Sequence, residues 1–126
     1  MGLILIVDDQ RPWRDDISAT VTTCGHTFAM ASGGNQAQEM MWENIYAAVI
    51  SDVQMPNGNG IELLQAARRI PSNQSTKFYV HSSEKELRYE GRLLFLPDMI
   101  PKTFPGAEFH MKRDLIPGIP DFLSQI

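Results

Sequence analysis

The segment Leu3-Ile4-Leu5-Ile6-Val7-Asp8-Asp9 decides the fold class of this protein. Its first part is apolar without interruption and mostly β-branched, which is typical of a strand buried on both faces of a parallel sheet. Two aspartates follow at once, and Pro12 then stands where a helix could begin, because proline suits the first helical turn. The segment therefore predicts a buried strand, an acidic loop and a helix, in that order.

The same alternation of strand and helix recurs along the chain. Short apolar stretches at 27–31, 47–50 and 78–80 predict three more strands, and between them apolar residues recur at helical spacing. Repeated strand–helix units imply βαβ crossovers and a parallel sheet. The fold class expected from the pattern is therefore α/β.

The last third of the chain has a weaker pattern. Residues 84–94 are expected to form a fourth helix, interrupted by one glycine, and residues 99–100 a short fifth strand directly before Lys102. Two prolines and two glycines make a long regular helix improbable over 103–118, so an irregular segment is expected there. A short amphipathic helix is expected to close the chain at 119–126.

Composition bounds the class of protein. The 126 residues are 43% apolar and 21% charged, as expected of one globular domain spanning residues 1–126. A net charge of −4 argues against tight binding to nucleic-acid phosphates. Cys24 is the single cysteine, so no internal disulfide can form, and the first apolar run is too short for a signal peptide or a membrane span. A cytoplasmic protein with no nucleic-acid or membrane partner is the expectation.

Polar residues cluster after the predicted strands. Asp8-Asp9, Asp52, Ser82 and Lys102 each follow one strand, and ligands of open parallel sheets bind at the carboxyl ends of strands. Carboxylates that converge there would repel one another unless a cation neutralised them, and an oxygen-rich site suits Mg²⁺. Asp52 could then act as a nucleophile that forms an acyl phosphate, with a hydroxyl and an ammonium close by to bind the new phosphate.

These residues resemble a known family. The motif Leu5–Asp9, the segment Val49–Pro56 with its glycine-rich turn, Ser82 and Lys102 are similar to receiver domains of two-component response regulators, of the single-domain, chemotaxis-regulator-like kind. Asp-x-x-Met-Pro before the turn is the most specific element, and the resemblance covers residues 3–102. It implies a flavodoxin-like, doubly wound sheet of five parallel strands in the order 2-1-3-4-5, to which the pattern adds the irregular C-terminal segment and the short last helix.

The resemblance also implies a role for each site residue. Asp52 would be the phospho-acceptor. Mg²⁺ would be held by Asp8, Asp9, Asp52 and the backbone carbonyl of Gln54. Ser82 would be the switch hydroxyl and Lys102 the lysine that pairs with the phosphate, while Gln54 and Glu84 would tune hydrolysis of the acyl phosphate.

The function implied is that of a stand-alone phospho-acceptor switch, not an enzyme in the ordinary sense. Its expected partners are a sensor histidine kinase or histidine phosphotransfer protein upstream and a protein target downstream. No DNA-binding motif follows the predicted domain, so transcriptional activity is not expected of this chain.

The sequence departs from the family pattern near Lys102. Thr103 follows it where proline is usual, and Met99 stands three residues before it, at a position that is often aromatic and part of the switch. His81 occupies a usually apolar position. Thr103 keeps open a second hypothesis, a degenerate receiver that acts as an interaction module without phosphorylation, although the intact set of Asp9, Asp52, Ser82 and Lys102 argues against it.

A hydrolase of the haloacid-dehalogenase kind is disfavoured. That reaction requires a second carboxylate, two residues after the nucleophile, as general acid and base, and Gln54 occupies this position. A neutral amide cannot transfer the proton.

Overall fold

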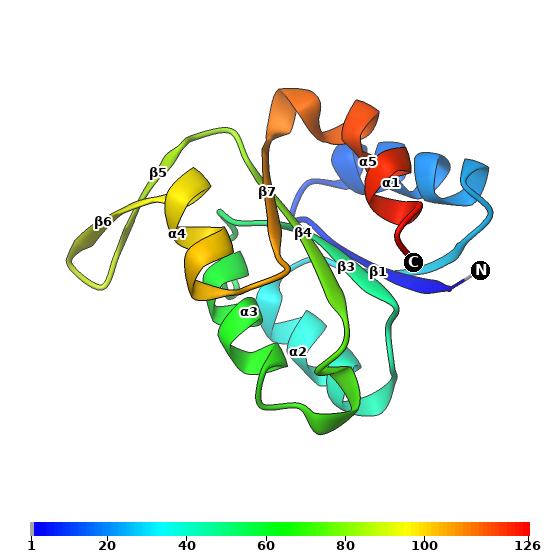
Figure 1. Ribbon diagram of the computed structural model, residues 1–126, viewed down its shortest axis with the longest axis horizontal. Helices are drawn as coiled ribbons and strands as arrows, with labels where there is room; N and C mark the ends of the chain where they lie inside the picture. Colours follow the sequence, from blue (N-terminus) through cyan, green and yellow to red (C-terminus); the bar gives the residue numbers. More distant parts are fainter. Residues whose placement is uncertain (1) are drawn as a thin grey trace.

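The computed structural model describes residues 2–126 and shows one five-stranded parallel sheet. Every neighbouring pair of strands in this sheet is parallel, and the order is β2-β1-β3-β4-β7 (Figure 1). The predicted flavodoxin-like fold class is confirmed, with β7 as the fifth strand. The strands are β1 (Leu3–Val7), β2 (Thr27–Ala31), β3 (Ala48–Asp52), β4 (Lys77–Ser82) and β7 (Glu108–Met111).

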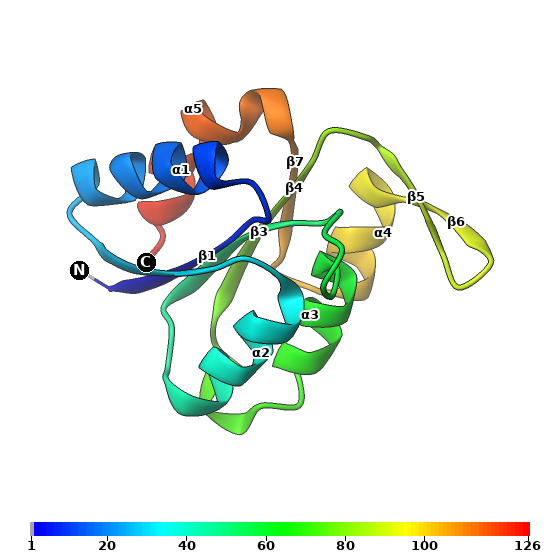
Figure 2. The ribbon, with the colours of Figure 1, turned by 180° about the vertical axis from the view of Figure 1, so that it is seen from behind.

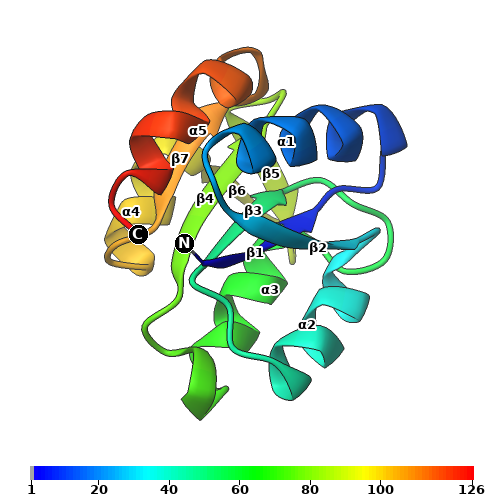
Figure 3. The ribbon, with the colours of Figure 1, turned by 90° about the vertical axis from the view of Figure 1, so that its right-hand side faces the viewer.

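Helices cover both faces of the sheet. Figure 3 shows α1 and α5 on one side of the strands and α2 and α3 on the other. No helix among residues 2–126 has the length and apolar character that crossing a bilayer would require. The helices are α1 (Arg11–Thr23), α2 (Gly34–Glu43), α3 (Gly60–Ala67), α4 (Leu96–Thr103) and α5 (Leu115–Leu123), with 3₁₀ turns η1 (Pro71–Asn73) and η2 (Lys112–Asp114).

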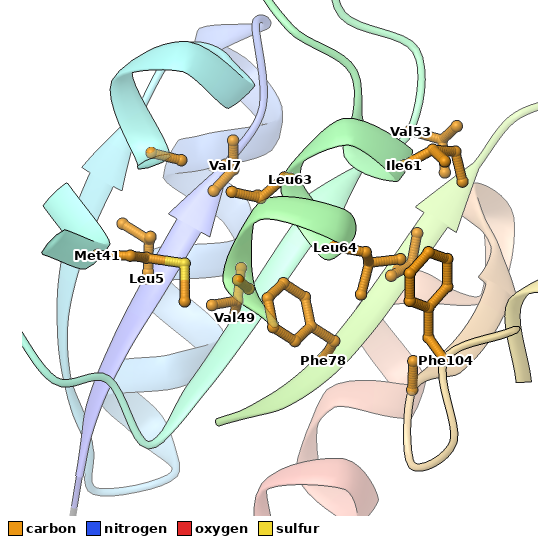
Figure 4. Close-up of a cluster of buried hydrophobic side chains, with 14 of the residues drawn as sticks. Leu5, Val7, Met41, Val49, Val53, Ile61, Leu63, Leu64, Phe78 and Phe104 are labelled. Carbon is orange, nitrogen blue, oxygen red and sulfur yellow. The ribbon is translucent and has the colours of Figure 1, made fainter. Parts of the chain in front are cut away.

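The sheet separates two apolar cores. Leu5 and Val7 of β1 face the core beneath α2, α3 and α4, which Figure 4 shows, whereas Ile4 and Ile6 face the core beneath α1 and α5. Successive side chains of a strand point to opposite faces, so a strand covered on both sides must be apolar throughout. This is the physical reason for the continuous apolar run at the start of the chain.

The segment predicted to form a fourth helix is instead a β-hairpin. Strands β5 (Glu86–Tyr89) and β6 (Arg92–Phe95) pair antiparallel and project beyond α4 in Figures 1 and 2. Glu90 and Gly91 both have positive φ, 51° and 76°, as a two-residue type I′ turn requires. The prediction of a helix at 84–94 is therefore wrong, because the glycine interpreted as an interruption makes a turn. One face of the hairpin packs on the core through Leu87, Tyr89 and Leu94.

The predicted fifth strand at 99–100 is also wrong. These residues lie inside α4, and the strand that completes the sheet is β7, eight residues further on. Residues 103–118 are therefore not irregular throughout, since they contain β7, η2 and the beginning of α5. Strand β7 lies at the sheet edge and carries Glu108 and His110 among its few residues, so its sequence lacks the apolar run that marks an interior strand.

Candidate functional site

Three carboxylates converge at the carboxyl edge of the sheet. Asp8 and Asp9 follow β1, Asp52 ends β3, and one oxygen of each lies within 4.8 Å of the others. Asp8 is fully buried and Asp52 nearly so, whereas Asp9 is exposed. The prediction that these acidic side chains meet is confirmed.

Backbone groups of the two loops hold these carboxylates. The Gln10 N–H donates to Asp8 Oδ1 at 2.9 Å, and the Gln54 N–H lies 3.4 Å from Asp52 Oδ1. The Arg14 guanidinium, from the first turns of α1, donates to the backbone carbonyl of Asp8 at 2.8 Å. The end of β1 is thus fixed by the helix that follows it.

The glycine-rich turn after β3 brings a loop close to Asp52. A Cβ added to Gly60 would lie 2.6 Å from the backbone carbonyl oxygen of Asp52, so only glycine fits there without displacing the backbone. Asn59 caps α3 through a reciprocal pair of hydrogen bonds with Glu62, each 2.9 Å long. Gly60 lets the start of α3 lie against the backbone of Asp52, and the Asn59 cap fixes the residue at which that helix begins.

The lysine at this site is Lys112. Its Nζ lies 3.1 Å from Asp52 Oδ2 and 3.3 Å from Asp8 Oδ2, and its side chain is only 12% exposed. The Trp13 ring covers it, with Nζ 5.0 Å from the ring centroid. Lys112 directly follows β7, which is the position that the sequence pattern assigned to Lys102.

Lys102 is not part of this site. It lies in α4 with a side chain that is 74% exposed, and its Nζ pairs with Asp98 Oδ1 one helical turn away, at 3.0 Å. The prediction that Lys102 follows the last strand and meets Asp52 is wrong, because the segment before it is helical. One signal could have found Lys112: the residue three positions before it is the aromatic Phe109. Arg113, not proline, follows it.

Ser82 ends β4 but is turned away from the acidic cluster. By strand alternation it shares the face of Val80, and its Oγ accepts a hydrogen bond of 3.1 Å from the N–H of the exposed Glu84. Ser83 lines the hollow beside Asp52 instead. This hollow has a volume of about 460 Å³ and is lined by Asp9, Gln10, Trp13, Asp52, Gln54, Ser83, Lys112 and Arg113.

Burial and repulsion between like charges raise the pKa values of the two buried carboxylates, Asp52 and Asp8. Burial, and after it the charge of the neighbouring Asp8, raise the pKa of Asp52 to about 6, although Lys112 and the Gln54 N–H act in the opposite direction. Burial likewise raises the pKa of Asp8. A cation in the hollow would relieve this repulsion.

The family model of the response regulator receiver domain matches residues 4–112. The chain belongs to this family. The matched segment begins in β1 and ends at Lys112, so it contains all three aspartates and the lysine that the structure brings to them. Family membership places the receiver in two-component phosphorelay signalling and implies that it accepts a phosphoryl group.

Curated relatives agree with this assignment. The receiver is 35% identical over 82 residues to a probable chemotaxis protein CheY of Rhizobium etli, an alignment that covers 64% of each chain. It is 31% identical over 108 residues to the transcriptional regulatory protein CpxR of Escherichia coli K12, covering 86% of the receiver and 46% of CpxR. The receiver therefore spans less than two thirds of the length of either relative.

Solved structures support the fold. The chemotaxis protein CheY4 of Vibrio cholerae, crystallised at low pH, superposes with a TM-score of 0.82 at 21% identity, covering 100% of the receiver and 98% of CheY4. The receiver domain of the hybrid histidine kinase CckA superposes with a TM-score of 0.74 at 25% identity, covering 98% and 97%. The sheet with its flanking helices is thus the fold of receiver domains.

Proposed function

We propose that this receiver takes a phosphoryl group onto Asp52 from a histidine kinase or phosphotransfer protein, in a Mg²⁺-dependent reaction, and thereby switches a protein interaction surface. The observation that carries the proposal is the position of the Asp52 carboxylate between two other aspartates and the ammonium of Lys112. Residues 1–126 would act as one cytoplasmic receiver domain without nucleic-acid or membrane partners, in keeping with its net charge of −4.

The donor set at the site fits a hard divalent cation. Receiver domains bind Mg²⁺ through acidic residues, and the clustered groups here offer only oxygen ligands. Three carboxylates and one ammonium leave a formal charge of −2, which one Mg²⁺ would cancel. Asp8, Asp9, Asp52 and the backbone carbonyl of Gln54 would hold the ion. When bound, it would screen the repulsion between Asp52 and an incoming phosphoryl group.

The chain's own residues would carry the transfer. A carboxylate oxygen of Asp52 forms the new O–P bond while the P–N bond to the donor histidine breaks, and the leaving imidazole takes up a proton. The ammonium of Lys112, which lies 3.1 Å from Asp52 Oδ2, would move to form an ion pair with the phosphoryl oxygens. The result is an acyl phosphate held by a charge-assisted contact.

The direct test uses a small phosphoryl donor. Incubation with acetyl phosphate and Mg²⁺ is expected to add the mass of one phosphoryl group to the wild type and none to Asp52→Asn, measured by intact-mass spectrometry. Chelation of the metal by EDTA should abolish the adduct. An equal adduct on Asp52→Asn would refute the proposed site, and no adduct on the wild type would favour the phosphorylation-independent interaction module instead.

A second prediction concerns the switch hydroxyl. We expect Ser82→Ala to weaken binding of the phosphoryl analogue beryllofluoride by about tenfold or more, since a hydrogen bond to a charged group contributes about 1.5–3 kcal/mol. Reversing a conformational population from 1:99 to 99:1 needs roughly 5.5 kcal/mol, so Lys112 and the metal must contribute too.

Ser83→Ala is the matched control for this measurement, because Ser83 lines the hollow in the unphosphorylated protein. If Ser83→Ala weakened beryllofluoride binding while Ser82→Ala did not, the switch hydroxyl would be Ser83. Fluorescence of Trp13, which lines the same hollow, gives the readout.

A further inference from the structure

A buried histidine lies beside the proposed phospho-acceptor. His81 of β4 pairs in register with Asp52 of β3, so their side chains share one face of the sheet. The ring of His81 is fully buried, and neither of its nitrogens has a hydrogen-bond partner among residues 2–126. Burying polar atoms without hydrogen-bond partners costs free energy. The presence of a buried histidine with two unpartnered nitrogens therefore calls for an explanation.

The ring lies close to one carboxylate of the acidic cluster. Nε2 of His81 lies 4.0 Å from Asp8 Oδ2, which is itself buried and has no hydrogen-bond partner in the described chain. At that distance no hydrogen bond exists. Among residues 2–126, the cationic side chain that contacts Asp8 Oδ2 is Lys112, at 3.3 Å. His81 and Asp8 Oδ2 thus face each other without a hydrogen bond between them, and Lys112 contacts both Asp8 and Asp52.

The ring of His81 is in the right form to donate. Burial, together with the nearby Lys112 and His110, lowers the pKa of His81 to about 3. The imidazole is therefore neutral at physiological pH and carries one N–H, while the other ring nitrogen carries none. This N–H is a donor that does not bring a second positive charge into the site.

We propose that His81 is a positioning residue that donates a hydrogen bond to Asp8 Oδ2 when Lys112 moves onto the phosphoryl group. The inference rests on the proposed function, in which Lys112 leaves its bridging position between the two aspartates. Oδ1 of Asp8 keeps its hydrogen bond from the Gln10 N–H, but Oδ2 then loses its contact with Lys112. A bound Mg²⁺ would offset the charge of the carboxylate, yet the buried side of Oδ2 that faces His81 would still lack a hydrogen-bond donor, which is unfavourable. A shift of about 1 Å brings His81 into hydrogen-bond range. His81 would thus stabilise the phosphorylated state more than the free state.

Two substitutions of nearly equal shape separate this role from simple packing. His81→Gln keeps a neutral N–H donor near the position of Nε2, whereas His81→Met fills similar space with no donor. If His81 only packs, the two variants should differ in thermal stability and bind ligands alike. If it positions Asp8, the glutamine variant should rescue binding that the methionine variant loses.

The experiment is a titration of each full-length variant with beryllofluoride in saturating Mg²⁺, followed by Trp13 fluorescence. We expect His81→Met to bind at least about tenfold more weakly than wild type and His81→Gln to bind nearly as tightly. Affinity for Mg²⁺ alone should be nearly the same in all three proteins, because Lys112 still serves Asp8 in that state. The melting temperature of free His81→Met should not fall, since the substitution removes two buried polar atoms without partners.

Nitrogen NMR of the histidine ring gives a readout independent of affinity. A slowly exchanging ring N–H signal of His81 is expected in the beryllofluoride complex of the wild type, with a shift that the free protein does not show. Wild-type affinity in His81→Met, or equal losses in both variants, would overturn the role of His81 and leave the proposed function intact. Failure of the wild type to bind beryllofluoride would overturn both.

Discussion

Replacing Lys112 by methionine is expected to weaken beryllofluoride binding at least about a hundredfold, whereas Lys102→Met should leave it unchanged. Removing one partner of a buried charge pair typically costs about 3–5 kcal/mol. Lys112 is such a partner, with Nζ near both Asp52 and Asp8 and a side chain only 12% exposed. Lys102 pairs only with Asp98 on the surface of α4, where an ion pair contributes about 0–1 kcal/mol.

The two lysine variants form a matched pair. Both remove one ammonium from the same chain and change its net charge equally, so a nonspecific effect of charge would lower binding in both. Titration of each variant with beryllofluoride in saturating Mg²⁺, followed by fluorescence, distinguishes such a nonspecific effect from a specific role of Lys112. Loss of binding in Lys102→Met, or retention in Lys112→Met, would contradict the assignment of Lys112 to the phosphate.

Asp52→Asn should make the metal-free protein more stable, with a gain that depends on pH. Burial and Asp8 raise the pKa of Asp52 to about 6 from an ordinary value of 3.8. Between these values the folded protein holds a proton that the unfolded chain has lost, so the free energy of unfolding of the wild type falls as pH rises through this range. The substitution removes this loss, which amounts to about 3 kcal/mol above pH 7.

Urea unfolding in EDTA at pH 4, 6 and 7.5 measures the effect. The stabilisation by Asp52→Asn should be small at pH 4 and reach its full size at pH 7.5. Asp121→Asn, which removes an exposed carboxylate of α5, is the control and should follow the wild type at every pH. Added Mg²⁺ should stabilise the wild type and reduce the difference. If the increase in the free energy of unfolding does not vary with pH, the prediction that burial and Asp8 raise the pKa of Asp52 is wrong.

The sequence by itself determined the fold class and the acidic cluster. Interior strands such as β1 and β3 are covered on both faces, so they must be continuously apolar, and this marks them in the sequence. In a parallel sheet all strands end at the same edge, so Asp8, Asp9 and Asp52 had to converge once those strands were recognised. The glycine-rich turn was also recognisable in the sequence. The structure gives the physical reason for Gly60, since a Cβ there would collide with the backbone of Asp52.

Only the tertiary structure decided which lysine meets the phospho-acceptor. The hairpin β5–β6 depends on a two-residue turn with positive φ at Glu90 and Gly91, which a helical interpretation of the same residues overlooks. Strand β7 lies at the sheet edge and has no continuous apolar pattern of its own, so its place is set by pairing with the distant strand β4. That long-range pairing moves the end of the fifth strand to Lys112, while Lys102 stays on an exposed helix.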